Sequence, residues 1–396
     1  MIMKNNNENK ILNVPNLRFP EFSGEWVTKS INDLAVVIGG GTPDTTVKSY
    51  WDGEIQWFTP SEIGKNKYVD SSLRTITEVG LNNSSAKLLP PNTILLSSRA
   101  TIGECSLSLR ECATNQGFQC LVSKKCNVDF LYYLIQTKKK DLIRKSCGST
   151  FLEISANEVR KIQVSVPSDV EQQKIAELLS LIDERIATQN KIIEKYESLI
   201  KGLNNILLYG TEGKYVCLGD ILLERSERSR TNNQHEVLSS TVKGIFSQRE
   251  YFSKDIASEN NVGYKIIRLH DVVLSPQNLW MGNINYNDRF DIGIVSPSYK
   301  VFSIADGYDN QFVAAMLKTY RALYSYMMVS EQGASIVRRN LNMEAFLQLV
   351  FKIPSLDKQR EIGYAISLLK YQLKTANKII RAYISQKKYL LRQMFI

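Results

Sequence analysis

Few residues of this chain are arranged as a catalytic site would require. An adenine methyltransferase needs an Asn/Asp-Pro-Pro-aromatic motif to hold a flipped base. The nearest string, Pro90-Pro91-Asn92, has these residues in the wrong order. A phosphate-binding loop of the form GxxxxGK[ST] is missing as well, because 210–214 lacks the spacing and Tyr215 stands where Ser or Thr is needed. We therefore expect no catalytic site and no cofactor bound by this chain.

Other combinations are weaker still. Glu212-Gly213-Lys214 matches half of a nuclease motif, but such triplets are common by chance. The run Gly39-Gly40-Gly41 favours a tight turn over a cofactor loop. With only two histidines, and six cysteines that show no CxxC spacing, we expect no metal site and reduced, mostly buried thiols.

Composition points to a globular protein with an anionic partner. The chain has 50 Lys and Arg against 40 Asp and Glu, a net charge of +10, which favours a polyanion although the signal is weak alone. No apolar run is long enough to span a membrane, and the polar start MIMKNNNENK lacks an apolar signal region. We expect a cytoplasmic location.

An internal repeat organises the chain. Residues 166–208 align with 353–395 without gaps from Pro167 onward, and 15 of 42 aligned positions are identical. Each copy predicts one long helix of roughly 60 Å, preceded by a proline that ends a strand and by Ser168 or Ser355 as the N-cap. Apolar residues alternate at spacings of four and three, which is typical of a coiled-coil seam. The predicted seam comprises Ile175, Leu179, Ile182, Ile186, Ile193, Tyr196, Ile362, Ile366, Leu369, Leu373, Ile380 and Tyr383.

The two helices are expected to run antiparallel. A domain of the size of the intervening segment is roughly 40 Å across, too short to bridge the length of a parallel pair. The sequence thus predicts two α/β (α+β) domains separated by a long antiparallel two-helix coiled coil, a dumbbell with pseudo-twofold symmetry. The expected segments are a first domain at 1–165, a first spacer helix at 166–210, a second domain at 211–353 and a second spacer helix at 354–396.

The two domains match each other only in outline. The segment DVVLSPQNLWMGN (271–283) corresponds to TILLSSRATIG (93–103), and SPSYKVFSI (296–304) corresponds to NQGFQCLV (115–122). WFTPSEI (57–63) has no clear counterpart in the second domain. Closely matched helices with divergent domains indicate a shared framework that carries two different reading surfaces.

The opening LRFPEF-GEW, WFTPSEI, LLSSRATIG, GSTFLEIS and the VP-x₄-QQ-x-I helix start together resemble the specificity subunits of type I restriction–modification systems. The resemblance implies that each target-recognition domain reads one half of a bipartite, asymmetric double-stranded DNA site and that the helices set the gap. It also implies a scaffold for two methyltransferase and two restriction subunits, which would carry S-adenosylmethionine, ATP and Mg in phage defence.

Contacts to DNA are expected in polar loops, because Arg, Asn and Gln present paired donors or acceptors to base edges. In the first domain the candidates are Gly41, Thr42, Thr59, Ser61, Arg99, Thr101, Asn115, Gln116, Ser149 and Thr150. In the second domain they are Arg228, Arg230, Gln277, Asn278, Ser298, Ser335, Arg338 and Arg339. The alternative for each is an ordinary turn residue or a solvated charge.

Two other classes stay open from the sequence alone. One is a coiled-coil scaffold that never touches DNA, against which the divergent domains and the positive charge argue. The other is a fused nuclease or methyltransferase, against which the missing motifs argue.

Overall fold

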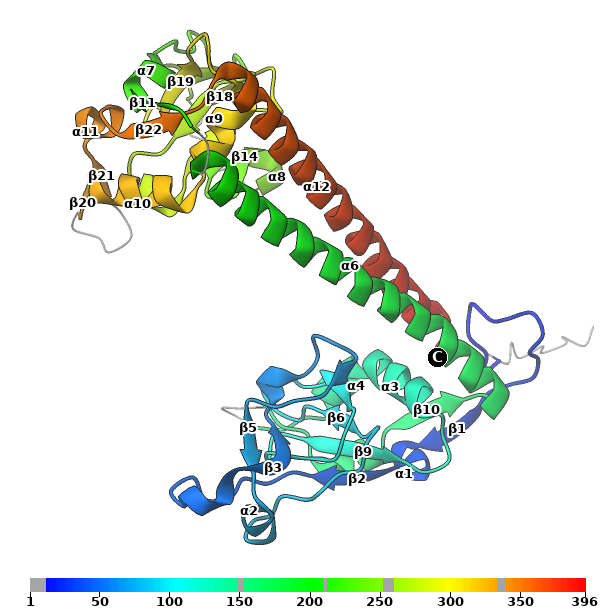
Figure 1. Cartoon of the computed structure of the whole chain (residues 1–396). Helices are drawn as coiled ribbons and strands as arrows, with labels where there is room; N and C mark the ends of the chain where they lie inside the picture. Colours follow the sequence, from blue (N-terminus) through cyan, green and yellow to red (C-terminus); the bar gives the residue numbers. More distant parts are fainter. Residues whose placement is uncertain (1–11, 149–151, 210–211, 252–259, 333–338) are drawn as a thin grey trace, which may run out of the picture. The chain divides into compact units, whose positions relative to one another are not determined.

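The computed structural model describes residues 12–148, 152–209, 212–251, 260–332 and 339–396 (Figure 1). Packing divides the chain into two compact units, one of residues 1–191 with 378–396 and the other of residues 192–377. Among the described residues, no helix is both long and apolar enough to cross a membrane.

The first unit is built on a five-stranded sheet whose central strands are buried. Its order is β2-β9-β6-β7-β4, and a second sheet has the order β5-β3-β8. The run from Thr93 to Ser98 is buried throughout, including its polar residues. The strands are β2 (Ala35–Gly39), β3 (Trp51–Phe58), β4 (Tyr68–Val69), β5 (Arg74–Ile76), β6 (Ile94–Leu96), β7 (Cys105–Ser108), β8 (Cys112–Thr114) and β9 (Gln119–Ser123).

The second unit repeats the order of the first sheet. Strands β12, β19, β16 and β17 follow one another as β2, β9, β6 and β7 do. Strand β16, from the segment 271–283, therefore takes the place of β6, as the sequence comparison predicts. The bounds are β12 (Leu222–Arg225), β16 (Val272–Leu274), β17 (Ile284–Tyr286) and β19 (Lys300–Ile304).

The remaining strands differ between the units. The pair β1 (Val27–Ser30) and β10 (Gln163–Val166) is matched by β11 (Lys214–Cys217) and β22 (Val350–Ile353). Strand β3 ends with Trp57 and Phe58 of WFTPSEI, and its three-stranded sheet has no match among the described residues of the second unit. Two pairs stand there instead, β13 (Leu238–Thr241) with β14 (Gly244–Ser247) and β15 (Lys265–Arg268) with β18 (Ile292–Val295).

The repeat forms two long helices, α6 (Asp169–Tyr209) and α12 (Leu356–Gln393). All predicted seam residues are buried or half-buried, whereas most residues between them are exposed. The first seam positions pack into a domain core: Ile175 and Leu179 belong to the core of the first unit, and Ile362 and Ile366 to the core of the second.

Within the first unit the helices run in opposite directions. The end of α12 lies beside the start of α6, since Leu390 and Met394 share a core with Leu179. Lys387 Nζ on α12 also pairs with Asp183 Oδ1 on α6 at 2.7 Å. Phe395 completes this core by stacking on Phe130 at a centroid distance of 5.3 Å.

The two repeat copies have a glutamine at the same position, and each glutamine makes the same two contacts. Gln172 Nε2 donates to Pro167 O at 3.0 Å, and its Oε1 accepts from Asn127 N at 3.1 Å. Gln359 donates to Pro354 O at 3.0 Å, and its Oε1 accepts from Asp309 N at 2.9 Å. Asn127 and Asp309 are the N-caps of α3 (Val128–Thr137) and α9 (Asn310–Met316). Each long helix is thus fastened to the same helix of its domain.

Candidate nucleic-acid interface

Four predicted loops of the first unit meet at one end of its sheets. They follow the carboxyl ends of β2, β3, β6 and β8, and we call residues 41–42, 59–61, 99–101 and 115–117 the first loop cluster. Gly41 N donates to Thr114 O at 2.8 Å, and Asn115 N donates to Phe58 O at 3.1 Å. Ser98 N donates to Gly117 O at 2.8 Å. The backbone therefore joins loops that are far apart in sequence.

Several polar side chains of this cluster are exposed. Thr42, Ser61, Thr101 and Gln116 are open to solvent, and Thr42 Oγ1 donates to Gln116 Oε1. Asn115 is half-buried, and its Oδ1 accepts from Gly117 N at 2.9 Å, which leaves its amide donors for another partner. The arrangement offers both donors and acceptors on one surface.

Close packing requires glycine at positions 40 and 41. A left-handed backbone conformation does not. A Cβ on Gly41 would lie 2.3 Å from Ala86 N, and one on Gly40 would lie 2.0 Å from Asn115 O. Neither glycine has a positive φ. Gly41 O also accepts from Trp57 Nε1 at 2.9 Å, so the loop is held tightly against the second sheet.

Thr59 has a structural task in the cluster. Its backbone N and its Oγ1 donate to Glu62 Oε2 at 2.7 and 2.6 Å, which closes a capping box. Ser61 Oγ lies 3.0 Å from Thr59 Oγ1 and stays exposed. Ser61 is thus the more accessible of the two.

Arg99 is held in position by a carboxylate from a distant segment. Its Nη2 lies 2.8 Å from Glu153 Oε2, with 42% and 36% of the two side chains exposed. Ala100 adopts a φ of 53°. Ser97 Oγ and Thr101 Oγ1 share a hydrogen bond of 3.1 Å, so the loop turns tightly. Ser149 and Thr150 lie outside the described residues.

Arg74 was missed by the sequence reasoning. Its guanidinium carbon lies 3.5 Å from the centroid of the Trp51 ring, and it stands directly across from Trp57 in the β3–β5 pair. The side chain is exposed and has no ion pair among the residues described here. A lone arginine on a short strand gives no sequence signal, because the stacking partner lies on another strand.

In the second unit, one group of candidates surrounds the loop after β16. Arg339 N donates to Gln277 O at 3.1 Å, and the Arg339 guanidinium lies 5.0 Å from the Trp280 ring centroid. Gln277 is exposed and Asn278 is half-buried. Ser335 and Arg338 lie outside the part of the chain that the structure describes.

A second group lies where β15 begins and β18 ends. Arg228 forms an antiparallel bridge with Lys265, which pairs with Val295 just before the Ser298 turn. Arg228, Arg230 and Ser298 are exposed. Burial lowers the pKa of Lys265, and the nearby positive charges of Lys300 and Arg228 lower it further, against the opposing effect of Glu224.

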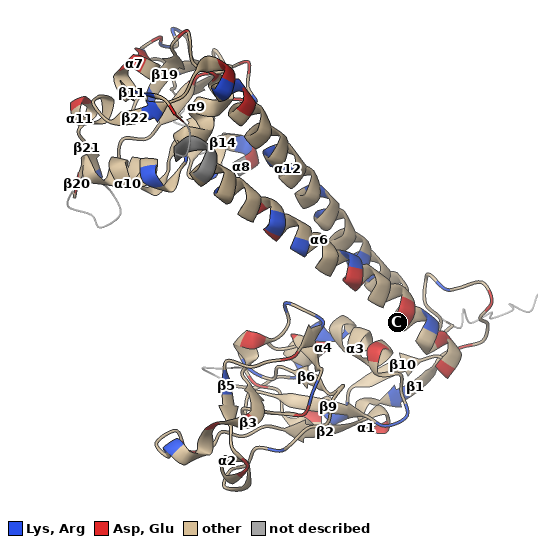
Figure 2. Cartoon of the chain, in the orientation of Figure 1, with Lys and Arg blue, Asp and Glu red and all other residues tan. Residues whose placement is uncertain are grey.

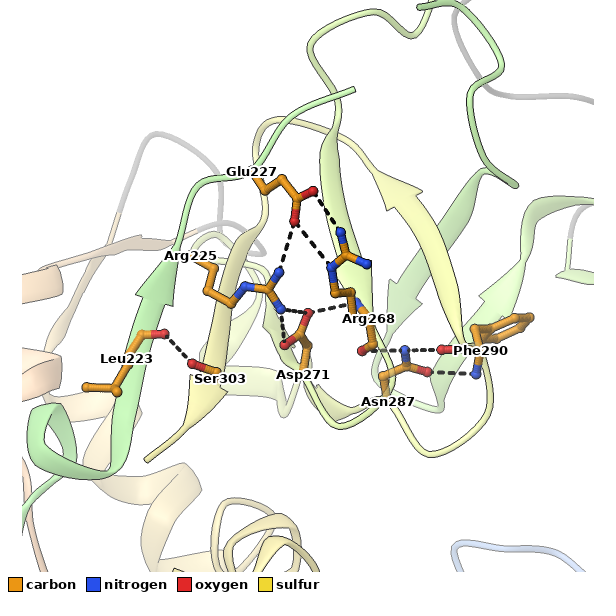
Figure 3. A network of polar contacts seen from close by, with 8 residues as sticks. All are labelled: Leu223, Arg225, Glu227, Arg268, Asp271, Asn287, Phe290 and Ser303. Carbon is orange, nitrogen blue, oxygen red and sulfur yellow. Dashed lines mark hydrogen bonds and ion pairs between the residues drawn. The ribbon is translucent and has the colours of Figure 1, made fainter. Parts of the chain in front are cut away.

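Figure 3 shows a polar network that anchors the segment leading to Arg228. Asp271 accepts from Arg225 Nη1 at 2.8 Å and from Arg268 N at 2.7 Å. Glu227 accepts from Arg225 Nη2 at 3.0 Å and from Arg268 Nη2 at 2.8 Å. Arg225 and Arg268 are therefore neutralised by carboxylates, while Arg228 and Arg230 lie beyond the network.

The described residues hold no cluster of three His, Cys, Asp or Glu side chains able to bind a metal. Burial raises the pKa of Cys105, Cys112 and Cys120 to about 12, so these thiols stay protonated. The residues of the first loop cluster thus offer hydrogen-bonding groups and the charge of Arg99.

Comparison with known proteins agrees with this geometry. Residues 23–198 match the family model described as type I restriction modification DNA specificity domain. The chain is 40% identical over 179 residues to the MjaIX specificity subunit of Methanocaldococcus jannaschii, covering 43% of this chain and 41% of that protein. It is 31% identical over 175 residues to the EcoR124I/EcoR124II specificity subunit of Escherichia coli, covering 42% and 43%. The alignments thus span about two-fifths of the length of these curated relatives.

Solved structures match over nearly the whole chain. A type I restriction–modification S subunit from M. genitalium has a TM-score of 0.61 at 15% identity, covering 97% of this chain and 99% of that one. A chain from a structure on complex assembly and conformational transition of the type I R-M system has a TM-score of 0.54 at 12% identity, covering 94% and 97%. The predicted fold class, two α/β domains with a long antiparallel helix pair, is confirmed.

Proposed function

We propose that this chain reads a bipartite, asymmetric DNA site, because residues 23–198 match the family model described as type I restriction modification DNA specificity domain. Each domain reads one half-site, and the long helices set the distance between the halves. The chain performs no catalysis itself.

The observation that carries this proposal is the convergence of four loops into the first loop cluster. Loops placed at one end of a rigid sheet are where recognition surfaces commonly lie. The exposed Thr42, Ser61 and Gln116, together with the ion-paired Arg99, supply the donor and acceptor groups that base edges and phosphates require. The duplicated sheet of the second unit supports a second reading domain.

We further propose that the chain works in the cytoplasm as a scaffold. Its partners are two methyltransferase and two restriction subunits, on which S-adenosylmethionine, ATP and Mg are bound. The two copies of the spacer helix support a twofold set of partners, because each copy offers a similar framework.

The proposal is tested by sequencing the methylome of the host with and without this gene. We expect one interrupted adenine- or cytosine-containing motif to lose its methylation when the gene is deleted. An unchanged methylome in a host whose methyltransferase subunit is expressed would contradict the proposal.

A further inference from the structure

The two copies of the repeat helix differ sharply in charge. Helix α12 contains nine basic and two acidic residues, whereas α6 contains five basic and seven acidic residues. After Glu361 the second copy has no further acidic residue to the end of the chain. In Figure 2 both signs of charge occur along α6. Binding of the same partner to both copies does not explain this difference in charge.

The basic residues at the end of α12 share one face. Lys378, Arg381, Lys388 and Arg392 are spaced by three, seven and four residues, so they lie along one side of a helix. We call these four residues the α12 basic stripe. All four are exposed, and none has an ion pair among the described residues. By contrast, Lys387 faces α6 and pairs with Asp183.

The corresponding face of α6 is not basic. Lys191 and Lys201 match Lys378 and Lys388, but Glu194 stands where α12 has Arg381, and Asn205 where it has Arg392. The substitution of Glu by Arg reverses the charge at the centre of the face. The stripe is thus a property of one copy and is not part of the shared framework.

We propose that the α12 basic stripe binds the phosphate backbone of duplex DNA, outside the two reading surfaces. The stripe extends roughly 20 Å, which corresponds to about six base pairs of duplex. Protein interfaces are depleted in lysine, whereas lysine and arginine neutralise phosphates and release counterions. The affinity that the α12 basic stripe adds is independent of the DNA sequence. It comes from only one of the two long helices.

The inference rests on the proposed function and is tested with two triple variants of the full chain. Arg381→Gln, Lys388→Gln and Arg392→Gln remove three charges from the stripe. Lys191→Gln, Lys195→Gln and Lys201→Gln remove three charges from α6 and serve as the matched control, since these lysines are also exposed. Affinity for a motif duplex and a random duplex is measured by fluorescence anisotropy across about 50 to 200 mM salt.

The stripe variant should lose affinity equally for both duplexes, and the slope of log affinity against log salt should fall by about two to three. The control should keep a slope close to that of the wild-type chain. Equal losses in both variants, or no loss in the stripe variant, would overturn the assignment. Loss of assembly with the methyltransferase subunit at unchanged DNA affinity would show that the face binds protein, which also overturns it. A wild-type chain without affinity for either duplex would contradict the proposed function itself.

Discussion

At the scale of single residues, the arginines of the loops divide by their partners. Arg225 and Arg268 are held by carboxylates inside a domain, and Arg99 shares an exposed pair with Glu153. Arg74 and Arg228 have no carboxylate partner among the described residues. Carboxylate contacts thus hold Arg225, Arg268 and Arg99 in position, whereas the described residues offer Arg74 and Arg228 no such contact.

Arg99→Ala should weaken binding to a motif duplex by about 1–3 kcal/mol if the guanidinium reads a guanine. Binding to random duplex should change little. Glu153→Gln is the companion variant: it frees Arg99 and removes a negative charge, so affinity for random duplex should rise by up to about fivefold. Fluorescence anisotropy checks both. An equal loss on both duplexes in Arg99→Ala would make Arg99 a phosphate contact instead.

Glu227 should contribute to stability in a pH-dependent way. The hydrogen bond from Arg268 lowers the pKa of this carboxyl, with Arg225 acting in the same direction. A lowered pKa gives stability that is present above the unfolded pKa of about 4.3 and is lost as the pH falls through the folded pKa. Asp271 has the opposite sign, because burial raises its pKa.

Glu227→Gln should therefore lower the melting temperature slightly at about pH 7, and the difference from wild type should shrink toward about pH 4. The effect is small because the pair is exposed. Glu236→Gln, another exposed carboxylate of the same unit, is the control. A difference that stays constant between these pH values, measured by calorimetry, would rule out the ion pair as its source.

At the scale of elements, the repeated glutamine links each long helix to its domain. Gln172→Ala should destabilise the first unit by about 1–3 kcal/mol, because Pro167 O and Asn127 N lose their partner in a buried site. Gln173→Ala, one residue further and exposed, should change stability by less than about 0.5 kcal/mol.

Urea denaturation followed by tryptophan fluorescence separates the two variants. Three of the four tryptophans, Trp26, Trp51 and Trp57, lie in the first unit, so the signal reports mainly on that unit. Equal midpoints for Gln172→Ala and Gln173→Ala would mean that the repeated contact carries no stability.

The periodicity of apolar residues predicts the two long helices well, but it predicts poorly what these helices pack against. The spacing of apolar residues locates both helices to within a few residues, because a helical stripe is written locally in sequence. It does not reveal that Ile175 and Ile362 pack into domain cores and not only against the other helix. The sequence names polar residues in each loop of the first loop cluster, and their contact with DNA stays a prediction. It does not reveal the backbone bonds that join the loops or the Arg74–Trp51 stack, because these arise between distant strands.

At the scale of the whole molecule, we propose that the two long helices set the distance between the half-sites. Seven residues inserted after Lys191 in α6 and after Asn377 in α12 add two turns to each helix and about 10 Å to its length. The gap in the methylated motif should grow by about three base pairs. These three base pairs also rotate the second half-site about the duplex axis by over a quarter turn. A gap that differs slightly from three added base pairs is therefore also consistent with this role of the helices.

An insertion in α6 alone serves as the control, since it puts the two seams out of register. It should buckle the helix pair and weaken assembly with the methyltransferase subunits. An unchanged gap in the double insertion, with methylation retained, would mean that another part of the complex sets the spacing.

In the proposed function, each domain reads its own half of the site. The direct measurement replaces residues 17–165 by the matching domain of a relative with a different motif, keeping Pro167 and both long helices. The methylome of a strain with this chimaera is then read by single-molecule sequencing. We expect one half of the motif to change while the other half and the gap stay the same. A change in both halves, or in neither, would contradict the proposed function.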